Sequence, residues 1–167
     1  AVSTSIEKAY TVSVKAISRS GIESQVASAA WTTDRTAPTD PELTLDVGDM
    51  TQKKDIQATF SSTDAVGIGK YECALDAGSY SACSSPKSFL NLSETTHAIS
   101  VRAVDKAGNV SKVVSKSVLV DATKPVIAFT SVSPSLVNGK SEYSSLKISF
   151  TVTETGSGLL STQCSFD

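Results

Sequence analysis

The sequence predicts an all-β protein made of β-sandwich domains arranged end to end, and three observations support this prediction. Apolar and polar residues alternate over short runs, which is typical of strands with one buried face. Turn signals rich in Gly, Asp and Ser separate these runs at intervals of about 8–12 residues. The chain also repeats itself, and no stretch shows the 3.6-residue period of an amphipathic helix.

The internal repeat sets the organisation of the 167 residues. Residues 10–38 align without a gap on residues 97–125, at an offset of 87 residues (97 − 10) and with 10 of 29 positions identical. Residues 60–76 also resemble residues 150–167, with one residue inserted. A period of about ninety residues therefore runs along the whole chain.

This period predicts three parts. Residues 1–38 are the C-terminal half of one repeat, residues 39–124 are one complete repeat, and residues 125–167 are the N-terminal half of a third. The Pro-containing joints between them are short, so we expect the domains to follow one another as semi-rigid units.

The strands expected in the central repeat follow from alternation and from the turns between them. The clearest is 97–104, where His97, Ile99, Val101 and Ala103 share one face. The other expected strands are 42–47, 55–62, 69–75, 87–92 and 113–120. Turn signals such as "DAVGIG", "LDAGS" and "DKAGN" lie between them.

One segment resembles a known group of repeats. "SETTHAISVRAVDKAGNVS" (93–111) has an alternating strand ending V-x-A-x-D and then A-G-N, and a joint of the form D-x-T-x-P follows at 121–125. This pattern resembles the bacterial immunoglobulin-like and fibronectin type III-like repeats of large surface proteins. The resemblance covers essentially the whole chain. It implies tandem Ig-like (fibronectin type III-like) β-sandwiches and leaves the ligand open, because one sandwich fold hosts many functions.

Two of the three cysteines are predicted to form a structural disulfide. If "LDAGS" turns the chain, Cys73 and Cys83 return side by side, within reach of a disulfide. The segment "YECALDAGSYSACSSP" (71–86) also resembles a subset of such repeats that carry a local cysteine pair. A zinc site would need other spacings and four ligands. A disulfide implies an oxidising compartment, so we expect an extracellular or cell-surface location.

The third cysteine, Cys164, falls on Cys73 in the alignment of the repeats. We expect its partner about ten residues further on, which would make this chain a window onto a longer array. The alternative is that separate chains complete each other's half-domains head to tail.

Acidic residues gather in the expected joints and end loops. We interpret them as caps of turns, with calcium as the alternative, because Ca²⁺ binds six to eight oxygen ligands and no D-x-D-x-D-G loop is present. The residues concerned are Asp34, Asp40, Asp64, Asp105, Asp121 and Glu154.

Catalysis finds no support in the sequence. The single histidine, His97, occupies the place of Tyr10 in the preceding repeat and is interpreted as a structural residue. Trp31, which aligns with Val118, is interpreted as a packing residue rather than a sugar-stacking platform. We therefore expect no enzyme activity, no catalytic residue, no cofactor and no metal ligand.

Composition excludes further classes. The net charge of −2 gives no basic surface for nucleic acid, and no apolar run reaches the length of a membrane span. We expect a structural stalk or fibre segment of a bacterial surface or secreted protein, whose partners are the neighbouring repeats. The alternatives are an adhesin repeat that binds a glycan or protein, and an accessory module of a secreted enzyme.

Overall fold

The computed structural model describes residues 8–133 and 147–165. The remaining residues, 1–7, 134–146 and 166–167, belong to the predicted first and third repeats and lie outside the described part of the chain. Every regular element within the described ranges is a strand. These strands are β1 (Lys8–Val14), β2 (Ala27–Thr33), β3 (Glu42–Leu45), β4 (Met50–Thr51), β5 (Ile56–Ser61), β6 (Ile68–Leu75), β7 (Ser81–Cys83), β8 (Lys87–Phe89), β9 (Thr96–Asp105), β10 (Val114–Val120), β11 (Val126–Ser133) and β12 (Lys147–Thr153).

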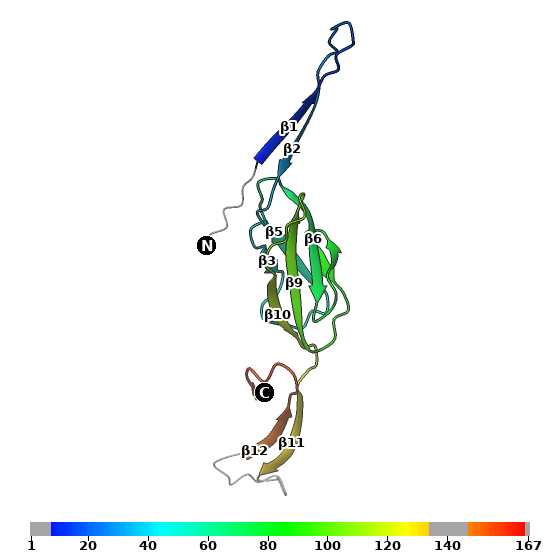
Figure 1. Cartoon of the computed structure of the whole chain (residues 1–167). Coiled ribbons are helices and arrows are strands. Elements are labelled where there is room, and N and C mark those ends of the chain that lie inside the picture. Colours follow the sequence, from blue (N-terminus) through cyan, green and yellow to red (C-terminus); the bar gives the residue numbers. More distant parts are fainter. Residues whose placement is uncertain (1–7, 134–146, 166–167) are drawn as a thin grey trace. The chain divides into compact units, whose positions relative to one another are not determined.

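Strands β3 to β10 form two sheets (Figure 1). The larger sheet has the order β4-β10-β9-β6-β7, and the smaller has the order β3-β5-β8. Strand β6 pairs antiparallel with both β7 and β9, whereas β4 pairs parallel with β10. Alternating segments of the chain thus contribute to different sheets, as in a β-sandwich.

The buried side chains lie on both sheets. Strand β5 alternates strictly, with Ile56, Ala58 and Phe60 buried and the residues between them exposed. Phe60 meets Tyr71 of the other sheet edge to face, with ring centroids 5.0 Å apart. Among the residues that the structure describes, the buried hydrophobic ones are Leu43, Ile56, Ala58, Phe60, Cys73, Ala74, Phe89, Leu92, Ile99, Val101, Ala103, Val104, Val118 and Val120. The predicted all-β sandwich is confirmed.

The strand predictions for this region are confirmed with two omissions. Each of the six expected ranges overlaps an observed strand, and no bound differs by more than three residues. The structure adds β4 and β7, which have two and three residues and are too short to show alternation. Strand β9 is also more buried than its pattern predicts, because Ser100 and Val104 are buried on the face expected to be open.

The other strands form two antiparallel hairpins. β1 pairs with β2, and β11 pairs with β12 across an irregularity between Phe129 and Ser131. Many apolar side chains on both hairpins are exposed, among them Val12, Trp31 and Phe129.

The predicted boundaries at 38/39 and 124/125 stay a prediction. By its internal contacts the chain divides into two compact units, and this division cuts through β3, β5, β8, β9 and β10 rather than at the joints. Among the described residues, no helix has the length and apolar character needed to cross a bilayer.

Candidate functional site

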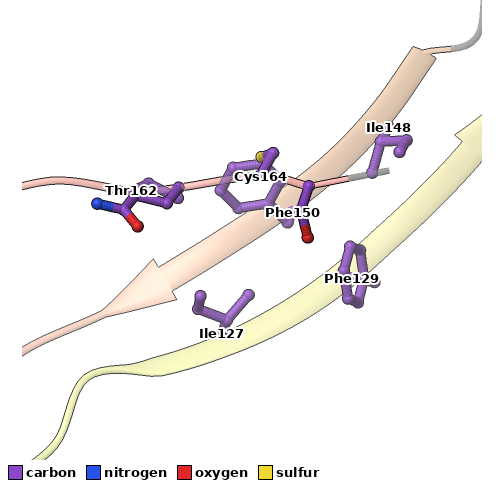
Figure 2. Close-up of a pocket in the computed structure, with 8 residues that line it drawn as sticks. Ile127, Phe129, Ile148, Phe150, Thr162 and Cys164 are labelled. Atoms are coloured by element: carbon purple, nitrogen blue, oxygen red, sulfur yellow. The ribbon is translucent and has the colours of Figure 1, made fainter. Parts of the chain in front are cut away.

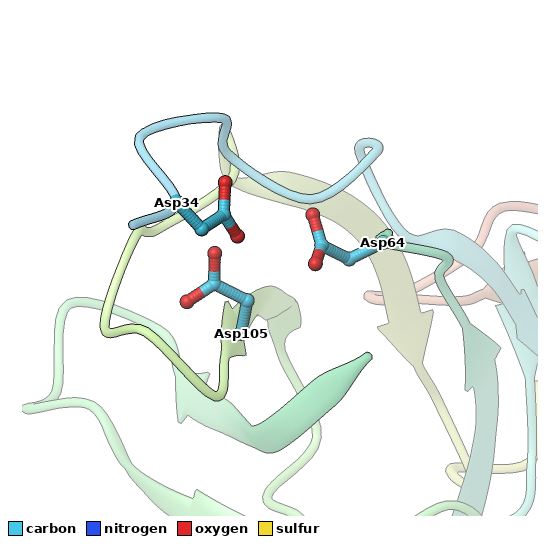
Figure 3. A group of neighbouring side chains, drawn as sticks. All are labelled: Asp34, Asp64 and Asp105. Atoms are coloured by element: carbon cyan, nitrogen blue, oxygen red, sulfur yellow. The ribbon is translucent and has the colours of Figure 1, made fainter. Parts of the chain in front are cut away.

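Three carboxylates converge where three separate segments meet (Figure 3). Asp34 follows β2, Asp64 lies in the turn between β5 and β6, and Asp105 is the last residue of β9. One carboxylate oxygen from each lies within 4.8 Å of the others. We call this group the aspartate cluster.

Glycines allow the loops of Asp64 and Asp105 to come together. The backbone N–H of Lys106 donates a hydrogen bond to the carbonyl of Gly67 over 3.1 Å. Gly67 has a φ of 88°, which favours glycine. At Gly69, a Cβ would lie only 2.6 Å from the carbonyl oxygen of Asp105, so no other residue fits without a backbone shift. These glycines hold the β5–β6 turn against the end of β9.

The Asp105 carboxylate is buried and heavily hydrogen-bonded. Its Oδ1 accepts bonds from the N–H groups of Gly108 (2.6 Å) and Asn109 (2.8 Å), and its Oδ2 accepts one from Asn109 Nδ2 (2.7 Å). Burial by itself raises the pKa of Asp105, but the bonds from the Asn109 side chain and the turn N–H groups outweigh it and hold the pKa below its usual range. The carboxylate is therefore ionised at neutral pH.

Asp34 is attached to the same turn and leaves one oxygen unsatisfied. Asn109 Nδ2 also lies 3.3 Å from the Asp34 carbonyl oxygen, and Asp34 Oδ1 accepts a bond from the N–H of Thr36. Asp34 Oδ2, however, is buried and has no hydrogen-bond partner. A buried carboxylate oxygen without a partner is costly to the folded state.

A related pair lies at the second joint. Asp121 is the repeat counterpart of Asp34, and Glu154 is the counterpart of Asp64. The Asp121 carboxylate accepts a bond from the N–H of Ser157 (2.6 Å). Hydrogen bonds from the Ser157 side chain and N–H hold the pKa of Asp121 below its ordinary value. A side-chain hydrogen bond with Glu154 also lowers the pKa of Asp121, to a smaller extent.

The acidic residues named from the sequence therefore divide into three groups. Asp34, Asp64 and Asp105 come together, Asp121 and Glu154 form the second pair, and Asp40 accepts a bond from the N–H of Lys112 elsewhere. Turn capping is present as expected, because Asp34, Asp64 and Asp121 each accept a bond from the N–H two residues on. Capping uses one oxygen of each, and the second oxygen of Asp121 accepts the bond from Ser157.

The disulfide and His97 connect neighbouring segments of the central sandwich. Cys73 and Cys83 form a disulfide with a Cα–Cα distance of 5.8 Å, which joins β6 to β7, while Cys164 is a free, exposed cysteine. His97 is buried, and its Nε2 lies 3.0 Å from the carbonyl oxygen of Ser93. It therefore ties the start of β9 to the loop before it.

The apolar hollow on the β11–β12 hairpin has a different explanation. Ile127, Phe129, Ile148 and Phe150 line this hollow together with residues 162–165 (Figure 2). Its volume is about 370 Å³. Phe150 aligns with Phe60, whose side chain is only 4% exposed. The hollow thus has the character of a sandwich core face rather than of a ligand pocket.

The exposed aromatic pair on β1–β2 also occupies positions that are buried in the central sandwich. Tyr10 and Trp31 are register partners, and their rings stack with centroids 5.5 Å apart. Trp31 is 52% exposed, so the β1–β2 hairpin alone does not bury this residue as the packing interpretation expects. Its counterpart Val118 is 1% exposed in the central sandwich, which marks the position as a core position.

Comparisons with known proteins give a limited result. No family model matches the sequence, and no curated protein matches it. Among solved structures, the fibronectin(III)-like modules of Clostridium thermocellum CbhA are similar to this chain, with 24% sequence identity and a TM-score of 0.40. The match covers 68% of this chain and 63% of that one. A likeness this distant carries no argument about function.

Proposed function

We propose that this chain is a non-catalytic, extracellular stalk or fibre segment made of tandem β-sandwich repeats. In broader terms it is a structural or accessory module, and the stalk is the specific role proposed. Its work is mechanical: the repeats hold a binding module away from the cell surface or form a fibre themselves. Its partners are the neighbouring repeats of the same kind.

The internal repeat, combined with burial, is the observation that carries this proposal. On β1, Val12 and Val14 are 48% and 63% exposed, whereas their counterparts Ile99 and Val101 on β9 are fully buried. The hairpin therefore presents a core face of the type that the central sandwich covers. In an array, the remaining strands of its own sandwich cover such a face, because a lone hairpin is marginally stable in water.

Two further features support an extracellular, load-bearing role. The Cys73–Cys83 disulfide fits an oxidising compartment. The joints Asp34–Pro38 and Asp121–Pro125 are short and end in proline, which limits the freedom between successive repeats.

An adhesin repeat is the second candidate, because Tyr10 and Trp31 stack on the surface of their hairpin. Exposed aromatic faces can bind sugar rings. We favour the stalk because the counterparts of this pair, His97 and Val118, are buried in the complete sandwich.

Force spectroscopy tests the mechanical role directly. Pulled from its ends, the chain should unfold its central repeat in a resolvable force peak. Reduction of Cys73–Cys83 should then add about 3 nm of contour length, because ten residues of chain are released at roughly 3.4 Å each. A central repeat that extends without a force peak would contradict the stalk, and binding of a glycan array that W31A abolishes would favour the adhesin.

A further inference from the structure

We propose that Asp121 locks the second joint by fastening it to the loop at residues 154–158, which follows β12. The lock deepens the proposed stalk role and rests on it for its purpose, because a stalk transmits force in a set direction only where its joints resist bending. The two residues that meet, Asp121 and Ser157, are 36 positions apart in sequence.

The Asp121 carboxylate binds the joint with one oxygen and the loop with the other. Its Oδ1 accepts a hydrogen bond from the N–H of Thr123 within the joint (3.1 Å). Its Oδ2 accepts a shorter one from the N–H of Ser157 (2.6 Å). Because hydrogen bonds to an ionised acceptor are stronger than those between neutral groups, the second bond is able to hold the loop against the joint.

Gly156 leaves room for this carboxylate. A Cβ at position 156 would overlap the carboxylate group of Asp121. The backbone conformation of the loop does not require glycine there, because the positive φ of this loop (83°) belongs to Gly158. The missing side chain at residue 156 therefore serves the contact with Asp121.

Glu154 gives the loop the shape that receives Asp121. Its Oε1 accepts a bond from the N–H of Gly156 (2.9 Å), and its Oε2 accepts one from the N–H of Gly158 (3.1 Å). The N–H groups of three successive residues thus bind carboxylates, as in the anion-binding concavities that successive backbone N–H groups form. Glu154 binds the outer two, and Asp121 binds the middle one.

The joint itself is anchored to the central repeat. The N–H of Asp121 donates a bond to the carbonyl of Thr51, at the end of β4 (2.9 Å). Thr123 Oγ1 donates to Glu94 Oε2 (2.5 Å), and Glu94 Oε1 lies 2.8 Å from Lys54 Nζ. Residues 121–123 are therefore held by two loops of the central repeat, so the Asp121 carboxylate starts from a fixed backbone.

Turn capping alone does not explain this arrangement. At the first joint, Asp34 Oδ1 caps Thr36 in the same way, but Asp34 Oδ2 is buried without a hydrogen-bond partner. At the second joint, the corresponding oxygen of Asp121 has a donor in a distant loop. Capping is common to both joints, whereas the lock belongs to the second.

NMR spectroscopy of the whole chain tests the lock through the Ser157 amide. Bonds from the Ser157 side chain and N–H hold the pKa of Asp121 below its ordinary value of 3.8, so the amide should stay bound at neutral pH and be released as pH falls through the lowered pKa. Its chemical shift should follow this titration. Glu154 and Glu94 are the other acidic groups at the joint, and Lys54 is the cation that faces Glu94.

Asp121→Asn separates the effect of Asp121 from that of the other groups. A single amide oxygen cannot take the positions of both carboxylate oxygens, so this variant can keep the Thr123 cap but not the bond to Ser157 as well. It should abolish the titration of the Ser157 amide and speed hydrogen exchange at this amide about tenfold.

Gly156→Ala and Gly48→Ala form a matched pair of variants. Gly156→Ala adds a methyl group where Asp121 sits and alters no charge, so it should speed exchange at Ser157 as Asp121→Asn does. A Cβ at Gly48 would have nothing within 4 Å, so Gly48→Ala should leave this exchange unchanged.

The same samples show whether the bond stiffens the joint. In wild-type protein, ¹⁵N relaxation should give β9 and β11 one rotational correlation time, and in Asp121→Asn it should give β11 a shorter one. Should Asp121→Asn fail to fold by circular dichroism, Gly156→Ala decides the outcome.

Three results would overturn the lock. These are a Ser157 amide that exchanges freely in the wild type, a titration that persists in Asp121→Asn, or the same correlation times in wild type and variants. Each would leave the force peak of the central repeat, and with it the stalk role, unaffected. Loss of that peak in a chain with a protected Ser157 amide would contradict the stalk and not the contact.

Discussion

At the scale of single residues, charges on the central sandwich are placed to satisfy one another. Glu72 on β6 lies directly opposite Arg102 on β9. Arg102 Nε and Nη2 lie 2.8 and 2.7 Å from Glu72 Oε2, and Lys70 Nζ lies 2.7 Å from Oε1. The Arg102 guanidinium also covers the ring of Tyr80, 4.4 Å from its centroid. These contacts connect β6 to β9 in the larger sheet, next to the β6–β7 hairpin that carries the disulfide. We call the ion pairs of Glu72 with Lys70 and Arg102 the clamp.

The clamp should make stability depend on pH in the acid range. Lys70 and then Arg102 hold the pKa of Glu72 below its usual value of 4.5. A lowered pKa means that the stabilisation is fully present above pH 4.5 and is lost as pH falls through the lower, folded-state pKa. Glu72→Gln should therefore lower stability at pH 7, by at most about 1 kcal/mol for a cross-strand pair, and should flatten the acid decline of Tm.

Melting curves between pH 2 and pH 7 measure this effect. Glu42→Gln removes an exposed carboxylate on β3 and serves as the matched control, with the acid decline of the wild type expected to persist. An unchanged acid decline in Glu72→Gln would show that the clamp does not contribute.

At the scale of elements, the disulfide fixes an edge strand that could not hold its place alone. Strand β7 has three residues and lies at the end of the sheet order, next to β6. Replacing both Cys73 and Cys83 by alanine should cost about 3 kcal/mol, because the loop that they close spans a separation of ten residues. Urea unfolding measures the loss, and amide exchange should show β7 opening before β9.

The free cysteine gives the control for this experiment. Cys164→Ala changes an exposed thiol and should leave the urea midpoint unchanged. A double Cys73/Cys83 variant as stable as the wild type would mean that turn and sheet contacts alone hold β7.

The same scale shows what the sequence can and cannot predict. Long alternating runs such as 97–104 predicted their strands, because their side chains line the core of the sandwich. β4 was missed because its two residues join the sheet only through Leu119 and Val120 of β10, far along the chain. The repeat singled out Asp34 and Asp121 as equivalent, but only the fold shows which other loops meet them. Gly69, which permits that meeting, gives no signal of its own in a strand pattern.

At the scale of the whole molecule, the burial pattern predicts that the central repeat is a unit of folding. All of the buried hydrophobic residues lie between Leu43 and Val120, and the hairpins on either side contribute none among the described residues. A domain with its own core can fold alone.

The segment 34–125, expressed by itself, should therefore unfold in one cooperative transition with the urea midpoint of the central transition in the whole chain. A shorter segment, 39–124, lacks the joint residues 34–38 and should fold equally well. Circular dichroism of the two segments shows whether the first joint contributes to the stability of the central repeat. An unfolded 34–125 segment would show that the repeat depends on its neighbours for stability. The array would then fold as a continuous unit, because contacts between neighbouring repeats would supply part of the stability of each one.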